Sequence, residues 1–250
     1  LDLKLDYVNG KFDRNYVNSQ EINYSQLNVS ASPSLQILRD DLTLNLGVSA
    51  ALNMDGERSE TNIFLYPRVT ASYRVVDEFF IAYAGIEGEL QQNTYRDFAK
   101  ENPFISPTID SIRPTDQQYD SYIGIKGKLS SNLSYNLRGS YIAQNDKALF
   151  KYNPRYDDGA GSTGNEGYQF GNSFNVVFDD VETFSFFGEL NYDLSNLKLR
   201  INAEAFTYDT TYEEEAWNLP DFKASFYADY QIDEHWFTGA QLFYVGERKD

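Results

Sequence analysis

The chain has 250 residues, with 38 Asp and Glu against 21 Lys and Arg, a formal net charge of −17, one His and no Cys. The absence of cysteine excludes disulfides, thiolate metal sites and cysteine nucleophiles. Because phosphate binding needs clustered Lys and Arg, the acidic balance argues against a nucleic-acid partner. The acidic residues form either a solvated surface or loops that bind cations or basic partners. No run approaches the ~18 apolar residues of a transmembrane helix, which excludes a helical membrane protein.

Alternation of apolar and polar residues is the dominant pattern. The chain opens with Leu1-Asp2-Leu3-Lys4-Leu5, and from Leu42 to Met54 every second residue is apolar. Side chains alternate across a strand, so one face meets an apolar medium and the other a polar one. The same alternation recurs in chain order over residues 27–37, 63–75, 80–90, 123–129, 133–141, 184–194, 197–205, 222–232 and 236–244.

Strand length and charge placement favour a membrane over a soluble β-sandwich, in which strands also alternate. The predicted strands have about ten to fourteen residues, against about five or six in globular proteins. The predicted apolar face carries no charge, whereas the polar face carries Lys, Arg and Glu in mid-strand, as a wet lumen allows. Pro33 and Pro67 suggest local bulges, since proline donates no ladder hydrogen bond.

The charged positions of the polar face are candidate lumen-lining residues. They either line a pore or hold a plug, or they simply pair with one another and stay hydrated. They are Arg68, Arg74, Glu87, Glu89, Lys126, Lys128, Arg138, Arg200 and Glu204.

The connections between these strands alternate in length. Short ones lie near residues 40–41, 77–78, 130–132, 195–196 and 233–235, and long ones cover 9–21, 55–62, 95–117, 146–182 and 209–220. Short periplasmic turns alternating with long external loops are typical of outer-membrane barrels. Counting Ser173 to Phe178 as a wall strand would put two short connections in succession, so we assign it to an outward excursion of a long loop.

Aromatic residues on the apolar face fall at two levels, as interfacial girdles would. Beside the short turns lie Tyr73, Phe80, Tyr135, Tyr192, Tyr230 and Trp236, and near the long loops lie Tyr7, Tyr141, Phe184, Phe222 and Tyr244.

These observations predict an all-β, transmembrane, antiparallel up-and-down β-barrel in the outer membrane of a Gram-negative bacterium. Residues 1–250 form one barrel domain with about eleven wall strands. Because an odd strand number is unusual and Asp250 does not end an apolar-aromatic closing strand, we expect further strands after Asp250. Whether strands also precede Leu1 stays open.

The texture of several strands and turns resembles the barrel of TonB-dependent receptors of the Bacteroidota type. The segments that carry it are Asn165–Asn172, Val181–Leu190, Leu219–Phe222 and Phe243–Arg248. The resemblance implies a barrel of about twenty-two strands, an N-terminal plug and nutrient uptake driven by an inner-membrane motor. It also implies outer-membrane lipid as surroundings, and a periplasmic energising protein or an outer-membrane lipoprotein as partners. These residues contain no plug-like segment, so energised import is implied by the resemblance only.

Other candidate sites favour plain interpretations. Asp157-Asp158, Asp179-Asp180 with Glu182, and Glu213–Glu215 match no Ca²⁺-loop spacing, so we interpret them as solvated loop charges. Gly159–Gly164 lacks the Lys-Ser/Thr ending of a phosphate loop. His235 falls in a predicted turn beside Trp236, and no Ser-His or Asp-His constellation points to an enzyme. We expect no catalytic residue, cofactor or metal.

Two functions from different classes fit the sequence best. One is the barrel of a nutrient-uptake receptor whose long loops capture a ligand. The alternative is a plugless structural or assembly barrel that binds partner proteins in the outer membrane. A soluble secreted or adhesive domain is a third option, which the uncharged apolar faces disfavour.

Overall fold

The structure, a computed structural model, describes residues 1–13, 21–106, 109, 112–153 and 173–250. Twelve strands and one short helix lie in this part of the chain. They are β1 (Asp2–Phe12), β2 (Ile22–Ser32), β3 (Ser34–Arg39), β4 (Leu42–Asp55), β5 (Glu60–Val76), β6 (Phe80–Gln91), α1 (Tyr95–Glu101), β7 (Thr115–Lys128), β8 (Leu133–Tyr152), β9 (Phe174–Asp193), β10 (Leu197–Thr210), β11 (Phe222–Gln231) and β12 (Phe237–Val245).

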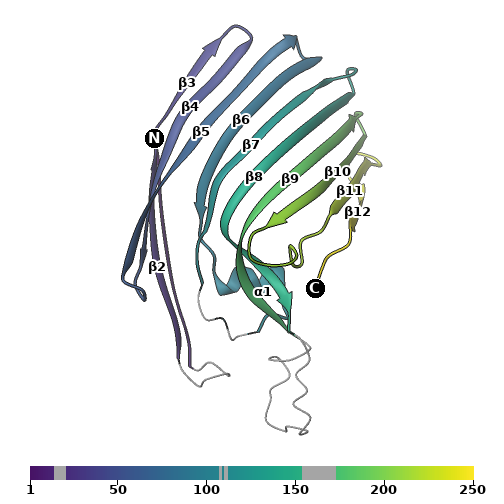
Figure 1. Cartoon of the computed structure of the whole chain (residues 1–250). Helices are drawn as coiled ribbons and strands as arrows, with labels where there is room; N and C mark the ends of the chain where they lie inside the picture. The colour runs from purple at the N-terminus through teal and green to yellow at the C-terminus, as the bar shows by residue number, and fades with distance from the viewer. Residues whose placement is uncertain (14–20, 107–108, 110–111, 154–172) are drawn as a thin grey trace.

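All strands belong to one antiparallel sheet in which chain neighbours are paired. The order is β1-β2-β4-β5-β6-β7-β8-β9-β10-β11-β12, with β3 paired to β4. Because β2 and β3 pair with successive parts of β4, they are two halves of one wall strand, and the wall has eleven positions. Figure 1 shows a strongly curved sheet that does not close on itself. The predicted fold class is confirmed, as is the number of wall strands.

Proline acts differently at its two wall positions. Pro33 separates β2 from β3 and accepts the Val48 N–H through its carbonyl (3.3 Å). The pairing with β4 keeps one register from Ala31↔Ala50 to Ser34↔Gly47, so Pro33 interrupts the strand but the predicted bulge is wrong. Pro67 pairs with Val48 inside the continuous β4–β5 ladder, so the bulge that we predicted at Pro67 is wrong. The β5–β6 register instead shifts at Arg74/Val76.

The connections alternate between two rims as predicted, but the connection between β4 and β5 is shorter than predicted. The turns after β3, β5, β7, β9 and β11 lie along one rim, and α1 and the strand ends that lead into the long connections lie at the other (Figure 1). The predicted long connection 55–62 is wrong, because β4 ends at Asp55 and β5 begins at Glu60. The Asp55 carboxylate accepts the backbone N–H groups of Glu57 and Arg58, both at 3.0 Å, which closes a tight turn.

The segment Ser173 to Phe178 is not a separate wall strand, but neither is it a loop. Phe174 begins β9, and β8 and β9 are both 20 residues long. Phe174–Asp179 pairs with Tyr152–Lys147, beyond a register shift between Gln144 and Lys147. The segment is therefore a continuation of β9 beyond the register shift. Its backbone N–H and C=O groups form hydrogen bonds with β8, although we had assigned the segment to a loop.

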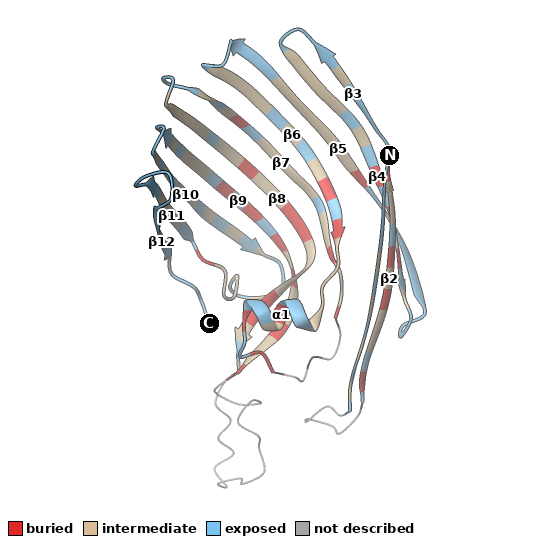
Figure 2. Cartoon of the chain, turned by 180° about the vertical axis from the view of Figure 1, so that it is seen from behind, coloured by how far each residue is buried: buried red, intermediate tan, exposed pale blue. Residues whose placement is uncertain are grey.

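The two faces of the sheet differ as the alternation predicts. Large apolar side chains such as Ile63 (75% exposed), Phe184 (64%) and Ile201 (52%) cover the outer face. Figure 2 shows buried residues gathering toward the rim that carries α1, while the strand ends at the other rim are exposed. Leu90, expected on the outer face, instead packs with Ala51 and Tyr66. It follows a register shift at Glu87/Glu89, where β7 carries one extra residue and the regular alternation of the pair is interrupted.

The aromatic residues of the outer face lie at the two predicted levels. Trp236 (69% exposed), Tyr73 and Tyr230 are exposed near the short turns. Near the long loops, the rings of Tyr141 and Phe184 lie 5.3 Å apart and those of Phe222 and Tyr244 6.0 Å apart. Such paired rings suit an interfacial girdle. No helix in the described part of the chain is long and apolar enough to cross a membrane.

Neighbouring positions of β10 test the assignment of the two faces. Ile201 is exposed on the outer face, whereas Asn202 accepts a hydrogen bond from Ser225 on the inner face (2.7 Å). Ile201→Lys should cost about 2–4 kcal/mol, because a charge at the lipid midplane loses its hydration, and Asn202→Lys should cost much less. Urea titration of the natural protein in lipid vesicles measures both. Equal costs would contradict this orientation.

Candidate functional site

The polar inner face carries an open pocket of about 420 Å³ between β1 and β7, and three predicted lumen residues line it. Arg68 lies 3.4 Å from the Asp2 carboxylate, and Glu87 accepts a hydrogen bond from the Tyr122 hydroxyl (3.0 Å). Glu89 accepts one from the Gln91 amide (3.1 Å). The arrangement brings residues far apart in sequence onto one polar surface.

Arg138 and Glu204 form the centre of a second group, on β8 and β10. The guanidinium of Arg138 lies 5.8 Å from the ring centres of both Tyr122 and Phe187, a distance at which a cation is attracted to a ring face. Its Nη2 is 3.9 Å from Glu204 Oε1, which also accepts a hydrogen bond from Ser185 (2.9 Å). Arg138 is thus held by rings and a carboxylate together.

The other predicted residues lie closer to the short turns. Lys128 pairs with Glu78 in the turn after β5, and Arg74 borders the same hollow. The hydrogen bond and charge of Lys128 lower the pKa of the exposed Glu78 carboxyl. Lys126 lies over the Tyr83 ring at 5.4 Å.

Arg200 donates to Asn191 through Nε (2.8 Å) and lies 4.0 Å from Glu189. The nine predicted residues therefore divide into the pocket group, the Arg138–Glu204 group and these wall and rim positions. They do not form a single site.

Sequence reasoning missed a pair of interlocked tyrosines and glycines on this face. The Tyr83 ring lies where a Cβ on Gly124 would be, and the Tyr122 ring lies where a Cβ on Gly85 would be. An aromatic ring that fills the space beside a glycine compensates for its missing side chain in a sheet. The signal was present as Tyr-x-Gly in both β6 and β7, at Tyr83–Gly85 and Tyr122–Gly124.

The connection between β6 and β7 folds back against the wall near the rim that carries α1. The amide of Gln26 in β2 donates to the Ile112 carbonyl (2.6 Å), and Asn28 bonds both Gln92 and Asn53 (2.6 Å each). These three wall side chains (Gln26, Asn28 and Asn53) are buried, and a buried polar network with its partners satisfied makes the local structure rigid.

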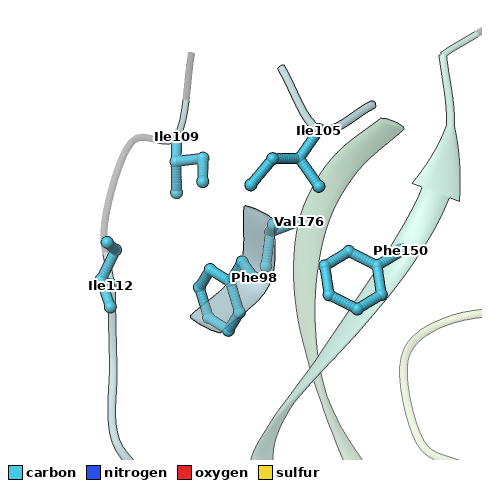
Figure 3. Close-up of a cluster of buried hydrophobic side chains, with 6 residues drawn as sticks. All are labelled: Phe98, Ile105, Ile109, Ile112, Phe150 and Val176. Carbon is cyan, nitrogen blue, oxygen red and sulfur yellow. The ribbon is translucent and has the colours of Figure 1, made fainter. Parts of the chain in front are cut away.

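An apolar cluster completes this attachment. Phe98 of α1 and Ile105, Ile109 and Ile112 pack with Phe150 of β8 and Val176 of β9 (Figure 3). The cluster joins the connection after β6 to the extension of the β8–β9 hairpin, two segments that the sequence separates by about forty residues or more.

Asp179 anchors the connection between β10 and β11. It is 1% exposed, and its carboxylate accepts the backbone N–H groups of Thr211 (3.2 Å), Tyr212 (3.0 Å) and Glu213 (2.7 Å). A buried carboxylate is costly unless it is hydrogen-bonded in this way. The interpretation of Asp179 as a solvated loop charge is therefore wrong.

Glu213 strengthens the same anchor. Its Oε2 accepts hydrogen bonds from Lys151 Nζ and from Trp217 Nε1, both at 2.7 Å, and Lys151 lies 5.0 Å from the centre of the Trp217 ring. Partial burial raises the pKa of Glu213, but the bonds from Lys151 and Trp217 and the charge of Lys151 outweigh it, so the net pKa lies below the ordinary value.

The remaining candidates add no chemistry. Asp157-Asp158, Gly159–Gly164 and the resemblance segment Asn165–Asn172 lie outside the described residues. Within the described ranges, no three His, Asp or Glu side chains converge as a metal site would require. His235 lies in the turn between β11 and β12, where its backbone N–H bonds Asp233 (2.7 Å).

Solved outer-membrane receptors share this fold. The pyoverdine outer membrane receptor FpvA of Pseudomonas aeruginosa aligns with 89% of this chain at 16% identity and a TM-score of 0.56. The alcaligin outer-membrane receptor FauA of Bordetella pertussis aligns with 92% at 14% identity and 0.56. The FrpB iron transporter of Neisseria meningitidis aligns with 89% at 11% identity and 0.57. No family model and no curated protein matches the sequence.

The alignments define the class of the fold. They cover 31%, 39% and 33% of the three structures, so the chain spans about a third of their length. The chain has the fold of part of the wall of an outer-membrane receptor barrel, and the predicted outer-membrane location agrees with these structures. At the level of fold, the neighbours are receptors and transporters and not enzymes.

The anchoring role of Asp179 can be tested by proteolysis. Asp179→Ala leaves three loop N–H groups without their acceptor, so local opening should become easier by about 3 kcal/mol, roughly a hundredfold. A Glu-specific protease acting at Glu213–Glu215 should then cleave the variant far faster than the parent. Asp209→Ala, an exposed carboxylate at the end of β10, is the control and should leave the rate unchanged. Unaltered cleavage in Asp179→Ala would contradict the anchor.

The Glu213 contacts predict a pH dependence. A carboxyl whose pKa is lowered by folding adds stability above its ordinary pKa, and this is lost as the pH falls through the lowered value. Trp217 fluorescence, measured in a Trp236→Phe background, should therefore change in acid, and Lys151→Met should move the midpoint to higher pH. Lys147→Met is the control, because Lys147 bonds Gln144 (2.6 Å) and not Glu213. Identical midpoints in all three proteins would exclude this coupling.

Proposed function

We propose that the chain is part of the barrel wall of a TonB-dependent receptor of the Bacteroidota type that takes up a nutrient across the outer membrane. The observation that carries the proposal is the receptor-type wall itself, which aligns with solved outer-membrane receptors over about nine tenths of the chain. The sequence texture of Val181–Leu190 and Phe243–Arg248 supports the same family.

The arrangement of the inner face supports uptake. Arg68, Glu87 and Glu89 border a polar pocket, so a hydrated solute or a polar protein segment meets hydrogen-bonding groups there. In the proposed receptor the candidate lumen residues line the interior, and the connections at the opposite rim from the short turns face outward. The anchored loops then form a fixed framework for ligand capture, because binding to a preorganised loop costs less ordering entropy.

The partners of this function follow from the family. Outer-membrane lipid surrounds the wall, and the protein partner is a periplasmic energising protein that drives transport or an outer-membrane lipoprotein. No nucleic acid takes part, since the chain has an excess of acidic residues.

The decisive experiment is peptide mapping by mass spectrometry of the natural polypeptide isolated from outer membranes. We expect a globular plug ahead of Leu1 and additional wall strands after Asp250. Cross-linking in intact cells should then join this polypeptide to a periplasmic energising protein. Wall strands alone on both sides would overturn energised import and favour a passive pore or an assembly barrel, and stable co-purification with other barrel proteins would select the latter.

A further inference from the structure

An apolar groove of about 430 Å³ lies on the outer face of the wall, over β8, β9 and β10. Its sides are formed by Leu129, Tyr135, Leu137, Leu190 and Ile201, and its floor includes Gly188 and Ala203. The groove lies within the surface that the fold turns toward the membrane.

The strand register explains why the wall is hollow here. Gly188 pairs with Leu137 on one side and with Ala203 on the other, so two small residues stand side by side. Leu190 pairs with Ile201 in the next outward-facing row. A Cβ on Gly188 would meet only the Leu137 Cδ2 atom, at 3.4 Å. Packing within the chain therefore does not require glycine at this position.

The groove offers an occupant little polar surface, since the hydroxyl of Tyr135 donates to the Phe79 carbonyl (3.2 Å). Glu189 and Asn202 also contribute to the lining, but their side chains bond inner-face partners: Asn191 donates to Glu189 (2.9 Å) and Ser225 donates to Asn202 (2.7 Å). The exposed sides, Leu129 at 61% and Ile201 at 52%, are aliphatic. An occupant must consequently be apolar along the whole length that enters.

The width of the groove selects among apolar occupants. The rows that contain Phe186 and Leu190 lie two residues to either side of Gly188, roughly 7 Å each way along β9. Their side chains narrow this space further. A helix with its side chains needs about 10 Å or more, whereas a single unbranched hydrocarbon chain fits and gains contacts on three sides.

We propose that this groove is a binding site for one acyl chain of a membrane phospholipid. The groove is continuous with the lipid-facing surface, and Leu129 and Tyr135 place one end of it beside the short turn between β7 and β8. The lipid comes from the leaflet next to the short turns, because its headgroup then lies at the level of Tyr135 and the neighbouring girdle residues.

A photoactivatable lipid tests the site in the natural full-length protein. The protein is placed in vesicles of phosphatidylethanolamine and phosphatidylglycerol that contain phosphatidylethanolamine with a diazirine midway along one acyl chain. After irradiation, mass spectrometry locates the cross-links. Positions around Gly188 should be labelled about threefold or more above other outer-face positions, as a modest affinity gain gives.

Leucine substitutions inside and outside the groove distinguish lipid binding in the groove from lipid contact with the wall in general. Gly188→Leu fills the floor and should reduce the labelling at Leu137, Leu190 and Ile201 to the level of the surrounding wall. Ala84→Leu adds a leucine to the outer face of β6, two strands away from β8, and should leave the labelling unchanged. If Gly188→Leu fails to fold, as judged by heat-modifiable mobility on a gel, Ala203→Leu fills the same floor from β10.

Three results would overturn the proposal. The first is uniform labelling of the wall, and the second is labelling that survives both floor substitutions. The third is a cross-link between two copies of the chain at Gly188, which would show that a second copy occupies the groove. The test does not depend on the transport mechanism, so its failure and the failure of the proposed function are distinguishable.

Discussion

Every backbone polar group within a bilayer must find its hydrogen-bond partner inside the protein, and this requirement governs the whole structure. The eleven wall positions meet it with continuous antiparallel ladders between chain neighbours. Because a ladder fixes which residues share a face, the requirement also assigns Ile201 to the membrane and Asn202 to the interior. The connections are consequently confined to the two rims.

The inner face is more ordered than a set of solvated charges. Arg138 is held by two rings and Glu204, Lys126 lies over Tyr83, and Tyr122 bonds Glu87 while lying over Gly85. The tyrosine rings fill the space beside the glycines, and the same rings attract the cations of Lys126 and Arg138. A pore lining and a surface that receives a plug both need groups fixed in this way, so the local chemistry is compatible with either use.

At the rim with the longer connections, buried polar side chains hold the connections in place through hydrogen bonds. Gln26, Asn28 and Asn53 hold the connection after β6, and Asp179 holds the connection after β10 through three backbone N–H groups. From their charge alone, the acidic segments were interpreted as solvated loops. Burial and hydrogen bonding convert one of those carboxylates into a structural support, while Glu213 beside it takes part in a lysine and tryptophan contact.

The sequence by itself determined the β class, the eleven wall strands, the outward and inward faces and most rim connections, because period-two alternation is a local property that one-sided burial imposes on each strand. The tertiary structure alone decided where that alternation is interrupted, as at Leu90 after the β6–β7 register shift, and that Pro67 remains within a ladder while Pro33 divides a strand. It also decided which charges meet. Arg138 in β8 and Glu204 in β10 lie on strands separated by β9, so their contact depends on how both strands pair with β9. Asp179 shows the same limit: a carboxylate becomes an anchor only when a distant loop brings three N–H groups to it, and no local pattern encodes that approach.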